Sequence, residues 1–398
     1  MNDTTVKSYR SGTHRVAPPC ETLARVRPFL STMGITRIAN VTGLDTIGIP
    51  VVMVCRPNSR SVSVSQGKGL DLDAAVASGV MESAEAYHAE SILLPIKLAS
   101  YRELRAAHAV VDVGGLPRAP DSYFHHDLPL LWIEGDDWVQ REKIWAPFQM
   151  VHLNFTRSLS YDLTSFAATS TGLASGNHLL EAASHAICEV VERDAFARFS
   201  RFSEAMKESR RIDLDSIDHP DCLRLLELYE RAGVAVAVWD ITSHVGIAAF
   251  QCAIVDRQED PFRPQIAADG VGCHPVRHIA LLRAMTEAAQ SRLTAISGAR
   301  DDMSMEDFLK WQDPADLKRQ RQLILHPGAR PFSGVPSFET DSLEDDIAWE
   351  MARVRASGCD RIILVDLTRP EFGVSVVRVL IPGMETAHLA AAWPMETA

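Results

Sequence analysis

Three segments of the chain combine short apolar runs with turn residues in the pattern of a β-hairpin. They cover residues 41–54, 238–256 and 364–382, and each has an apolar run, a turn with glycine and a second apolar run. The second and third segments also share an Asp-Ile-Thr or Asp-Leu-Thr step after the first run. Strand, tight turn and strand is typical of antiparallel pairing. The segments therefore predict mixed or antiparallel sheets built from related hairpins.

Between these segments, apolar residues recur at spacings of three and four, which predicts three long helices. The helices are expected at residues 71–99, 177–201 and 275–297, all rich in alanine. Asp71 and Asp73 can cap the first helix, and Asn177 can cap the second. Pro275 suits the first turn of the third helix, because proline there sacrifices no hydrogen bond.

The remaining pattern completes the predicted architecture. Shorter helices are expected at residues 221–232 and 343–356. The mixture predicts an α+β fold, in which helices pack against sheets. No linker rich in glycine, serine or proline divides the chain, so residues 21–385 are predicted to form one domain. Residues 1–20 are expected to be a flexible N-terminal segment, and residues 386–398 a tail.

Each long helix carries polar residues on one narrow face, because spacings of three and four return to the same side of a helix. These polar faces hold Ser78, Glu82 and Glu85 on the first helix, Asn177, Glu181, Glu189 and Glu192 with Arg193 at the edge on the second, and Arg283, Glu287 and Gln290 on the third. The opposite face of the second helix, expected to pack on the core, holds Leu179, Ala183, Ile187, Val190 and Val191.

The ordinary interpretation of such a polar face is a helix surface exposed to solvent. Two features favour a binding site instead. The faces lack the Glu-to-Lys pairs, four residues apart, that support exposed helices. Glu181, Glu189 and Glu192 also place like charges on one stripe, which is unfavourable unless a cation compensates them. Mg²⁺ meets this need, because it takes oxygen ligands and commonly bridges carboxylates to phosphates.

Charge and cysteine content narrow the class of protein. The 398 residues include 40 Lys and Arg against 52 Asp and Glu, a net charge of -12, so no nucleic-acid partner is expected. The seven cysteines are scattered without a Cys-x-x-Cys pair, which indicates neither a disulfide framework nor a zinc site. The N-terminus lacks the apolar core of a secretion signal, and the apolar runs are too short to span a membrane. We therefore expect a cytoplasmic protein that does not insert into membranes.

Familiar cofactor and catalytic motifs are incomplete. The segment around Lys68 lacks the leading glycine and the hydroxyl residue of a P-loop, and GVGC at 270–273 lacks the third glycine of a dinucleotide-binding loop. The serine of GLASG at 172–176 stands in the wrong place for a nucleophile elbow. Cys273 and His274 are more simply explained as a buried thiol and a packing histidine. No catalytic triad and no single catalytic residue is identified.

Three segments together resemble the motifs of the YcaO family of ATP-dependent peptide-modifying enzymes. The family's GKG turn and Ser-x-x-x-Glu-x-x-Glu helix match SVSQGKGLDLDAAVASGVMESAEAYHAE at 63–90. Its Asn-x-x-x-Glu and Glu-x-x-Glu-Arg steps match GNHLLEAASHAICEVVERDAFARF at 176–199, and its Arg-x-x-x-Glu-x-x-Gln-x-Arg helix matches GVGCHPVRHIALLRAMTEAAQSR at 270–292. The order and spacing agree, and the similarity extends from about residue 10 to residue 385.

The resemblance implies a YcaO-like fold with ATP and Mg²⁺ bound among the three helices. The residues implied to bridge Mg²⁺ to phosphate are Glu82, Glu85, Glu181, Glu189 and Glu192. Those implied to contact the nucleotide or orient its ligands are Ser78, Asn177, Arg193, Arg283, Glu287 and Gln290, together with Lys68, Arg15 and Thr22. In the implied reaction an external nucleophile attacks a peptide carbonyl, and the resulting oxyanion takes a phosphoryl group from ATP.

The N-terminal third resembles the subgroup that works with a TfuA-like partner and is associated with thioamide formation in the peptide backbone. The matching parts are KSYRSGTHR…ETLARVRPFL and the hairpin at 36–58. The C-terminus keeps a single Pro382-Gly383 step and lacks the proline-rich end of azoline-forming relatives. Ala86 stands where many members carry arginine, so one phosphate or salt-bridge contact is absent or supplied elsewhere.

Three functions remain open. The favoured one is installation of sulfur in a peptide or protein substrate together with a TfuA-like partner. Its sulfur is expected from outside the chain, because none of the seven cysteines lies beside a motif that marks a sulfur carrier. Only Cys188 falls near the proposed site on the helical wheel, and a packing thiol explains it at least as well. The alternatives are azoline or amidine formation by the same activation, and a non-catalytic module that recruits a peptide or partner. A homodimer is compatible with each of them.

Overall fold

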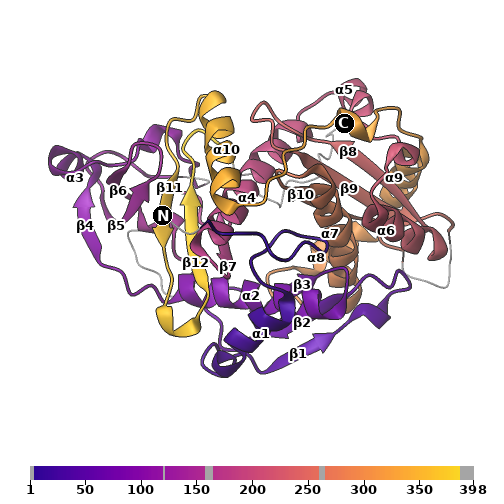
Figure 1. Ribbon diagram of the computed structural model, residues 1–398, viewed down its shortest axis with the longest axis horizontal. Helices are drawn as coiled ribbons and strands as arrows, with labels where there is room; N and C mark the ends of the chain where they lie inside the picture. Colours follow the sequence, from indigo (N-terminus) through magenta and orange to yellow (C-terminus); the bar gives the residue numbers. More distant parts are fainter. Residues whose placement is uncertain (1–3, 120–121, 157–164, 260–264, 386–398) are drawn as a thin grey trace.

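The computed structural model describes residues 4–119, 122–156, 165–259 and 265–385. In these residues the strands form three antiparallel sheets with helices packed between and around them, so the predicted α+β class is confirmed (Figure 1). A six-stranded sheet forms one side of the molecule and the sheet of β8–β10 the other, with the sheet of β1–β3 near the base (Figure 1).

Two of the predicted hairpins begin the three-stranded sheets. One sheet consists of β1 (Arg37–Asn40), β2 (Val51–Cys55) and β3 (Val64–Lys68), and the other of β8 (Val234–Asp240), β9 (Ala249–Asp256) and β10 (Ala268–Cys273). β1 pairs antiparallel with β2, and β8 pairs antiparallel with β9. The hairpin predicted at 238–256 is therefore confirmed. The one predicted at 41–54 is misplaced, because its first strand ends at Asn40 and residues 42–44 form a short 3-10 helix in the connection.

The third predicted hairpin lies inside the six-stranded sheet. The strands are β4 (Ile96–Ser100), β5 (Pro129–Asp137), β6 (Glu142–Pro147), β7 (Leu173–Gly176), β11 (Ile363–Asp366) and β12 (Ser375–Leu380). Their order is β4-β5-β11-β12-β7, with β6 also paired to β5. β11 and β12 pair antiparallel, which confirms the hairpin, and β12 also pairs antiparallel with β7.

In the described part of the chain, the five predicted helices are present together with five that the periodicity did not predict. They are α1 (Pro19–Val26), α2 (Leu72–Glu90), α3 (Tyr101–Ala107), α4 (Leu179–Ser200), α5 (Glu204–Ser209), α6 (Pro220–Arg231), α7 (Arg277–Ser297), α8 (Met305–Trp311), α9 (Pro314–Leu325) and α10 (Leu343–Ala356). The expectation that the first long helix reaches residue 99 is wrong. It ends at Glu90, because Pro95 cannot continue a helix and residues 96–100 instead pair with β5.

The predicted helix caps are right at the first helix and wrong at the second. The Asp71 side chain accepts a hydrogen bond from the backbone N–H of Ala74, as an N-cap does. At α4 the cap is His178, whose Nδ1 accepts from the N–H of Leu180, because the Asn177 amide is turned toward Glu181. Pro275 lies two residues before the start of α7 rather than in its first turn.

The N-terminal segment is held against α10 where it is described. Val6 forms an isolated bridge with Ser342, and the Lys7 ammonium lies 2.7 Å from the Asp346 carboxylate, with both side chains almost fully buried. The domain boundary at residue 21 stays a prediction. In the described parts of the chain, no helix has both the length and the apolar character to cross a membrane.

Candidate functional site

Glycines hold three helices close to the strands that precede them. α2 follows β3, α4 follows β7, and α7 follows β10, each after a short connection. A Cβ at Gly67 would lie 2.0 Å from the Ala75 carbonyl oxygen of α2, and one at Gly272 would lie 2.2 Å from the Ala280 oxygen of α7. Only glycine permits these approaches. The GKG and GVGC segments therefore serve helix packing, which brings the polar faces of the helices into one region.

The polar faces meet in a group of acidic side chains that we call the carboxylate cluster. Its members are Glu82 and Glu85 on α2, Glu189 and Glu192 on α4, Glu287 on α7 and Asp269 on β10. Glu85 interacts electrostatically with Glu82 and Glu189, and Glu192 interacts with Glu287. The Ser175 hydroxyl of β7 donates to Glu85 over 2.6 Å, and the Gln66 backbone N–H of β3 donates to Glu82 over 3.4 Å.

Burial makes most of the carboxylate cluster hard to ionise. It raises the pKa of Glu82 to about 7, that of Glu85 to about 8 and that of Glu189 to about 7. Burial likewise raises the pKa of Asp269 to about 6. The Glu82 side chain is exposed even so, which places it at the accessible side of the cluster. A bound cation would offset the unfavourable burial of these charges and favour their ionised forms.

Basic side chains surround the carboxylate cluster. The Lys68 ammonium lies 2.6 Å from Glu287 and donates to Gln290 over 3.1 Å. Burial opposes ionisation of Glu287, but Lys68 and Arg193 outweigh it, so its pKa is lowered. Arg193 also lies 3.6 Å from Glu192. The mixture of carboxylates and cations suits a polyanion bridged by metal, since both kinds of group find partners there.

Glu181 and Asn177 form a separate group at the start of α4. Glu181 Oε1 accepts from the Arg15 guanidinium over 3.3 Å and from the Asn177 N–H over 3.0 Å, and Oε2 accepts from the Val16 N–H over 2.8 Å. The Thr22 hydroxyl donates to Asn177 over 3.1 Å. The structure thus brings Arg15 and Thr22 to Asn177 and Glu181. The other four glutamates that were predicted to bind Mg²⁺ lie in the carboxylate cluster.

The predicted metal set is only partly assembled in this arrangement. Within the described residues, no group of three or more Asp, Glu, His or Cys side chains is placed to hold a metal ion by itself. Ser78 is half-buried on α2, one turn before Glu82. The roles assigned to Ser78 and to the five glutamates stay predictions.

Several residues near the site were missed by the sequence analysis. Asp269 belongs to the carboxylate cluster, and Ser175 contacts Glu85, although neither lies on a predicted polar helix face. His185 accepts a hydrogen bond at Nε2 from Arg283 over 2.8 Å. Of these residues, only His185 could have been found from the sequence pattern, because it lies four residues after Glu181 and therefore on the same side of α4. Strand residues such as Asp269 carry no such periodic signal.

Comparisons with known proteins agree with this architecture. The model of the YcaO family, described as "YcaO cyclodehydratase, ATP- and Mg2+-binding", matches residues 66–385. An uncharacterized protein in the tfuA 3′ region of Rhizobium leguminosarum bv. trifolii is 37% identical over 380 residues, which are 93% of this chain and 88% of that protein. The predicted cofactors ATP and Mg²⁺ are therefore confirmed at the level of the family.

Two solved structures share the fold. A heterocyclase in complex with substrate and cofactor matches with a TM-score of 0.78 and 19% identity over 97% of this chain, which spans only 54% of that chain. YcaO from Methanopyrus kandleri, bound with AMPPCP and Mg²⁺, matches with a TM-score of 0.75 and 23% identity over 98% of this chain and 99% of that chain. The family model matches most of the length of this chain, which shows that the chain belongs to the YcaO family.

Proposed function

We propose that this protein uses ATP and Mg²⁺ to activate a peptide backbone amide for replacement of its oxygen by sulfur, together with a TfuA-like partner. The observation that carries the proposal is the carboxylate cluster, where helices α2, α4 and α7 place acidic side chains of raised pKa beside Lys68 and Arg193. Such a region favours a nucleotide whose phosphates bring Mg²⁺ with them.

The residues present fit such a nucleotide. Mg²⁺ usually takes one or two protein carboxylates and completes its shell with phosphate oxygens and water. Glu85 and Glu189 are suited to this role, because each is half-buried beside another carboxylate and gains from a nearby cation. Lys68 and Arg283 would hold phosphate oxygens, Lys68 exchanging Glu287 and Gln290 for the ligand. These roles, and those of Ser78, Asn177, Glu181 and Gln290, are part of the proposal.

In this reaction the protein positions the reactants and neutralises charge, and none of its side chains acts as the nucleophile. Hydrosulfide would add to the amide carbonyl, and the resulting oxyanion would form a bond to the terminal phosphorus of ATP as ADP leaves. Expulsion of the oxygen as phosphate, with the proton on sulfur passing to the departing phosphate, would then form the carbon–sulfur double bond. The cationic groups stabilise the negative charge that builds up on oxygen and phosphate in both steps.

Support for sulfur and for the partner comes from the Rhizobium relative, which lies in a tfuA 3′ region. The single Pro382-Gly383 step agrees with it. A cytoplasmic location, where ATP is available, belongs to the same proposal. Azoline formation is the second candidate, because the family description names cyclodehydratases and a heterocyclase shares the fold.

Mass spectrometry separates the two candidates. A peptide from the same genomic region would be co-expressed with this protein, with and without the TfuA-like protein. Thioamide formation exchanges one oxygen for sulfur and raises the peptide mass, whereas azoline formation removes one water and lowers it. A mass gain that requires both proteins supports the proposal. A loss of water, or a gain that persists with the Glu189→Gln variant, contradicts it.

A further inference from the structure

The chain itself covers one half of the outer edge of β8. This strand stands at the end of the sheet order β10-β9-β8, so one of its sides faces away from β9 (Figure 1). In the second half of the strand, the Ile212 N–H donates to the Val238 carbonyl oxygen over 2.8 Å. The Asp240 N–H donates to the Arg210 carbonyl oxygen over 2.9 Å. A short extended segment of the chain thus pairs with this half of the edge.

The first half of the same edge has backbone groups without partners. The direction of the N–H and C=O groups repeats every two residues along a strand, so Val236 points them away from β9, as Val238 and Asp240 do. Neither group of Val236 forms a backbone hydrogen bond at this edge with the described residues, and Val236 is only half-buried. An open strand edge of this kind is a template for pairing with another extended chain.

A groove of about 200 Å³ lies along this open half of the edge. It is lined by residues 235–237 of β8, by residues 211–215, by Arg257, and by residues 324–328 at the end of α9 and after it. One water molecule takes about 30 Å³ in the liquid, so the groove admits a short peptide segment. The flanking segments leave β8 recessed, and a single extended chain fits there better than the edge of a second folded sheet.

Two carboxylates give the groove a negative charge that the described residues do not match. Asp213 is half-buried and Asp215 is exposed, and both line the groove. The Asp213 carboxylate accepts from the Asp215 N–H over 3.1 Å, and neither side chain forms an ion pair within 4 Å in the described parts of the chain. A ligand with positive charge would supply the missing partner.

The positively charged groups of the groove already have partners within the chain. Arg211 donates to two carbonyl oxygens at the end of α9 over 2.7 and 2.6 Å. Arg257 forms an ion pair with Glu230, and His326 lies 2.9 Å from Glu208. The groove therefore favours a basic ligand over an acidic one.

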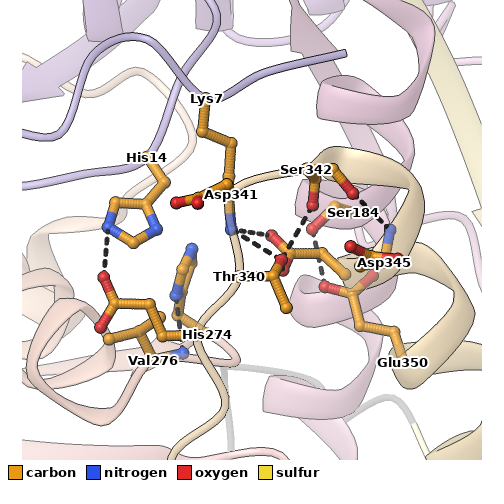
Figure 2. A network of polar contacts seen from close by, with 12 residues as sticks. Lys7, His14, Ser184, His274, Val276, Thr340, Asp341, Ser342, Asp345 and Glu350 are labelled. Carbon is orange, nitrogen blue, oxygen red and sulfur yellow. Dashed lines mark hydrogen bonds and ion pairs between the residues drawn. The ribbon is translucent and has the colours of Figure 1, made fainter. Parts of the chain in front are cut away.

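The described N-terminal residues are bound elsewhere and do not fill the groove. Val6 forms an isolated bridge with Ser342, just before α10. Figure 2 shows the Lys7 ammonium beside Thr340, to which it donates over 3.3 Å. These residues are held at α10, and the groove is left to a segment of another molecule.

We propose that this groove docks an extended, basic segment of the peptide substrate, which adds to the sheet as a strand beside Val236. The inference rests on the proposed function, because it names the part of the peptide that is recognised. Backbone hydrogen bonds to an open strand edge provide affinity for any extended peptide, and the side chains that flank the edge select among sequences. Asp213 and Asp215 select for lysine or arginine.

The position of the groove suits a segment at some distance from the modified residue. Val236 is in register with Ile254 of β9, and Ile254 is in register with Ala268 of β10, the residue before Asp269 of the carboxylate cluster. Since neighbouring strands lie about 4.8 Å apart, an added strand lies about 15 Å from β10, a distance that about five extended residues span. The docked segment therefore holds the substrate near the carboxylate cluster without itself being modified.

Fluorescence anisotropy with a labelled synthetic peptide of alternating lysine and valine tests the proposal on the full chain. We expect saturable binding, and a peptide with glutamate in place of lysine should bind about tenfold more weakly or worse. Two further peptides carry N-methyl groups on all valines or on all lysines. The one whose methylated residues face β8 should bind about tenfold more weakly or worse, because it loses hydrogen bonds to the strand edge. Equal binding by the acidic peptide or by both methylated peptides, or no binding at all, overturns the proposal.

Variants of the groove have matched controls. Val236→Pro removes the outward N–H without breaking a hydrogen bond to β9 and should weaken binding by about tenfold or more, whereas Val236→Ala keeps the N–H and should stay within about twofold. Asp215→Asn should weaken binding by about threefold, and Asp218→Asn, at an exposed position outside the groove, by less than about 1.5-fold. Equal effects within either pair overturn the proposal. The peptide experiments use the unaltered protein and decide the matter if Val236→Pro does not fold.

Hydrogen–deuterium exchange locates the bound peptide. Saturating lysine-valine peptide should slow amide exchange in the fragment that contains β8 and leave exchange unchanged in β1, the edge strand of another sheet. Equal protection of both edges, or protection of β1 alone, overturns the proposal. Self-association of the unaltered protein that Val236→Pro abolishes would assign the groove to a second copy of the chain and would overturn it as well.

The two proposals fail in different ways. The β,γ-methylene analogue of ATP would be titrated with Mg²⁺ into the same samples. If the unaltered protein binds the analogue but not the lysine-valine peptide, only the groove assignment is wrong. If it binds neither the analogue nor ATP, the proposed function itself is wrong, whatever the groove binds.

Discussion

Replacing Glu189 with glutamine should stabilise the nucleotide-free protein at alkaline pH while it removes Mg²⁺-dependent nucleotide binding. Burial raises the pKa of Glu189 from 4.5 to about 7. The native state therefore holds this proton more tightly than the unfolded chain does. Stability from this group is fully present below pH 4.5 and is lost as the pH rises through about 7. Glutamine carries no charge, so the variant does not lose this stability as the pH rises.

The size of the effect follows from the same pKa. A rise from 4.5 to about 7 disfavours the ionised native state by about 3 kcal/mol. Because Glu189 is half-buried and coupled to Glu85 and Glu192, we expect a gain of about 1–2 kcal/mol in the free energy of unfolding at pH 8. At about pH 5, close to the ordinary pKa of 4.5, most of this loss has not yet developed, and the gain should fall to about a quarter of its value at pH 8.

Urea unfolding of the nucleotide-free protein at both pH values measures this gain. Glu134→Gln, at an exposed position on β5, is the control and should change the free energy of unfolding by less than about 0.5 kcal/mol at either pH. Calorimetry with the ATP analogue and Mg²⁺ should show that Glu189→Gln lowers the affinity by about tenfold or more. A variant that is less stable than the unaltered protein at pH 8, or that binds the analogue normally, would refute the reasoning.

The remaining predictions are also tested by calorimetry and by urea unfolding. Nucleotide binding should require Mg²⁺, and equal affinity in EDTA would contradict this. Binding of the nucleotide with Mg²⁺ at pH 7 should release protons, because the raised pKa values of Glu82 and Glu85 fall when a cation binds. Calorimetry in buffers of different ionisation enthalpy measures this release, which should be smaller at pH 9. Binding without proton release at pH 7 would contradict the prediction. Arg56→Met should destabilise the protein by about 3–5 kcal/mol, because it leaves Glu90 buried without its partner at 2.7 Å, and adding Glu90→Gln should restore much of the loss.

The local pattern of the sequence determined the longest helices and part of the strands. Apolar runs around turns located the hairpins at 238–256 and 364–382 and the second strand of the one expected at 41–54. Spacings of three and four located α2, α4, α6, α7 and α10, because these signals depend on neighbours in the chain. The apolar face of α4 is buried as expected, with Ala183, Ile187 and Val191 fully enclosed. The sequence pattern did not determine the cap of α4. His178 caps the helix by accepting from the Leu180 N–H, whereas Asn177 donates its N–H to Glu181.

Only the tertiary structure decided which polar groups share a site. Glu181 lies on the same helical stripe as Glu192, yet it is bound by Arg15 and the Val16 N–H, which come from far away in the sequence. Asp269 joined the carboxylate cluster because Gly270 and Gly272 let α7 approach β10. The groove along β8 likewise combines residues 211–215 with residues 324–328. Such contacts depend on how separate elements pack, and no periodicity within one element encodes them.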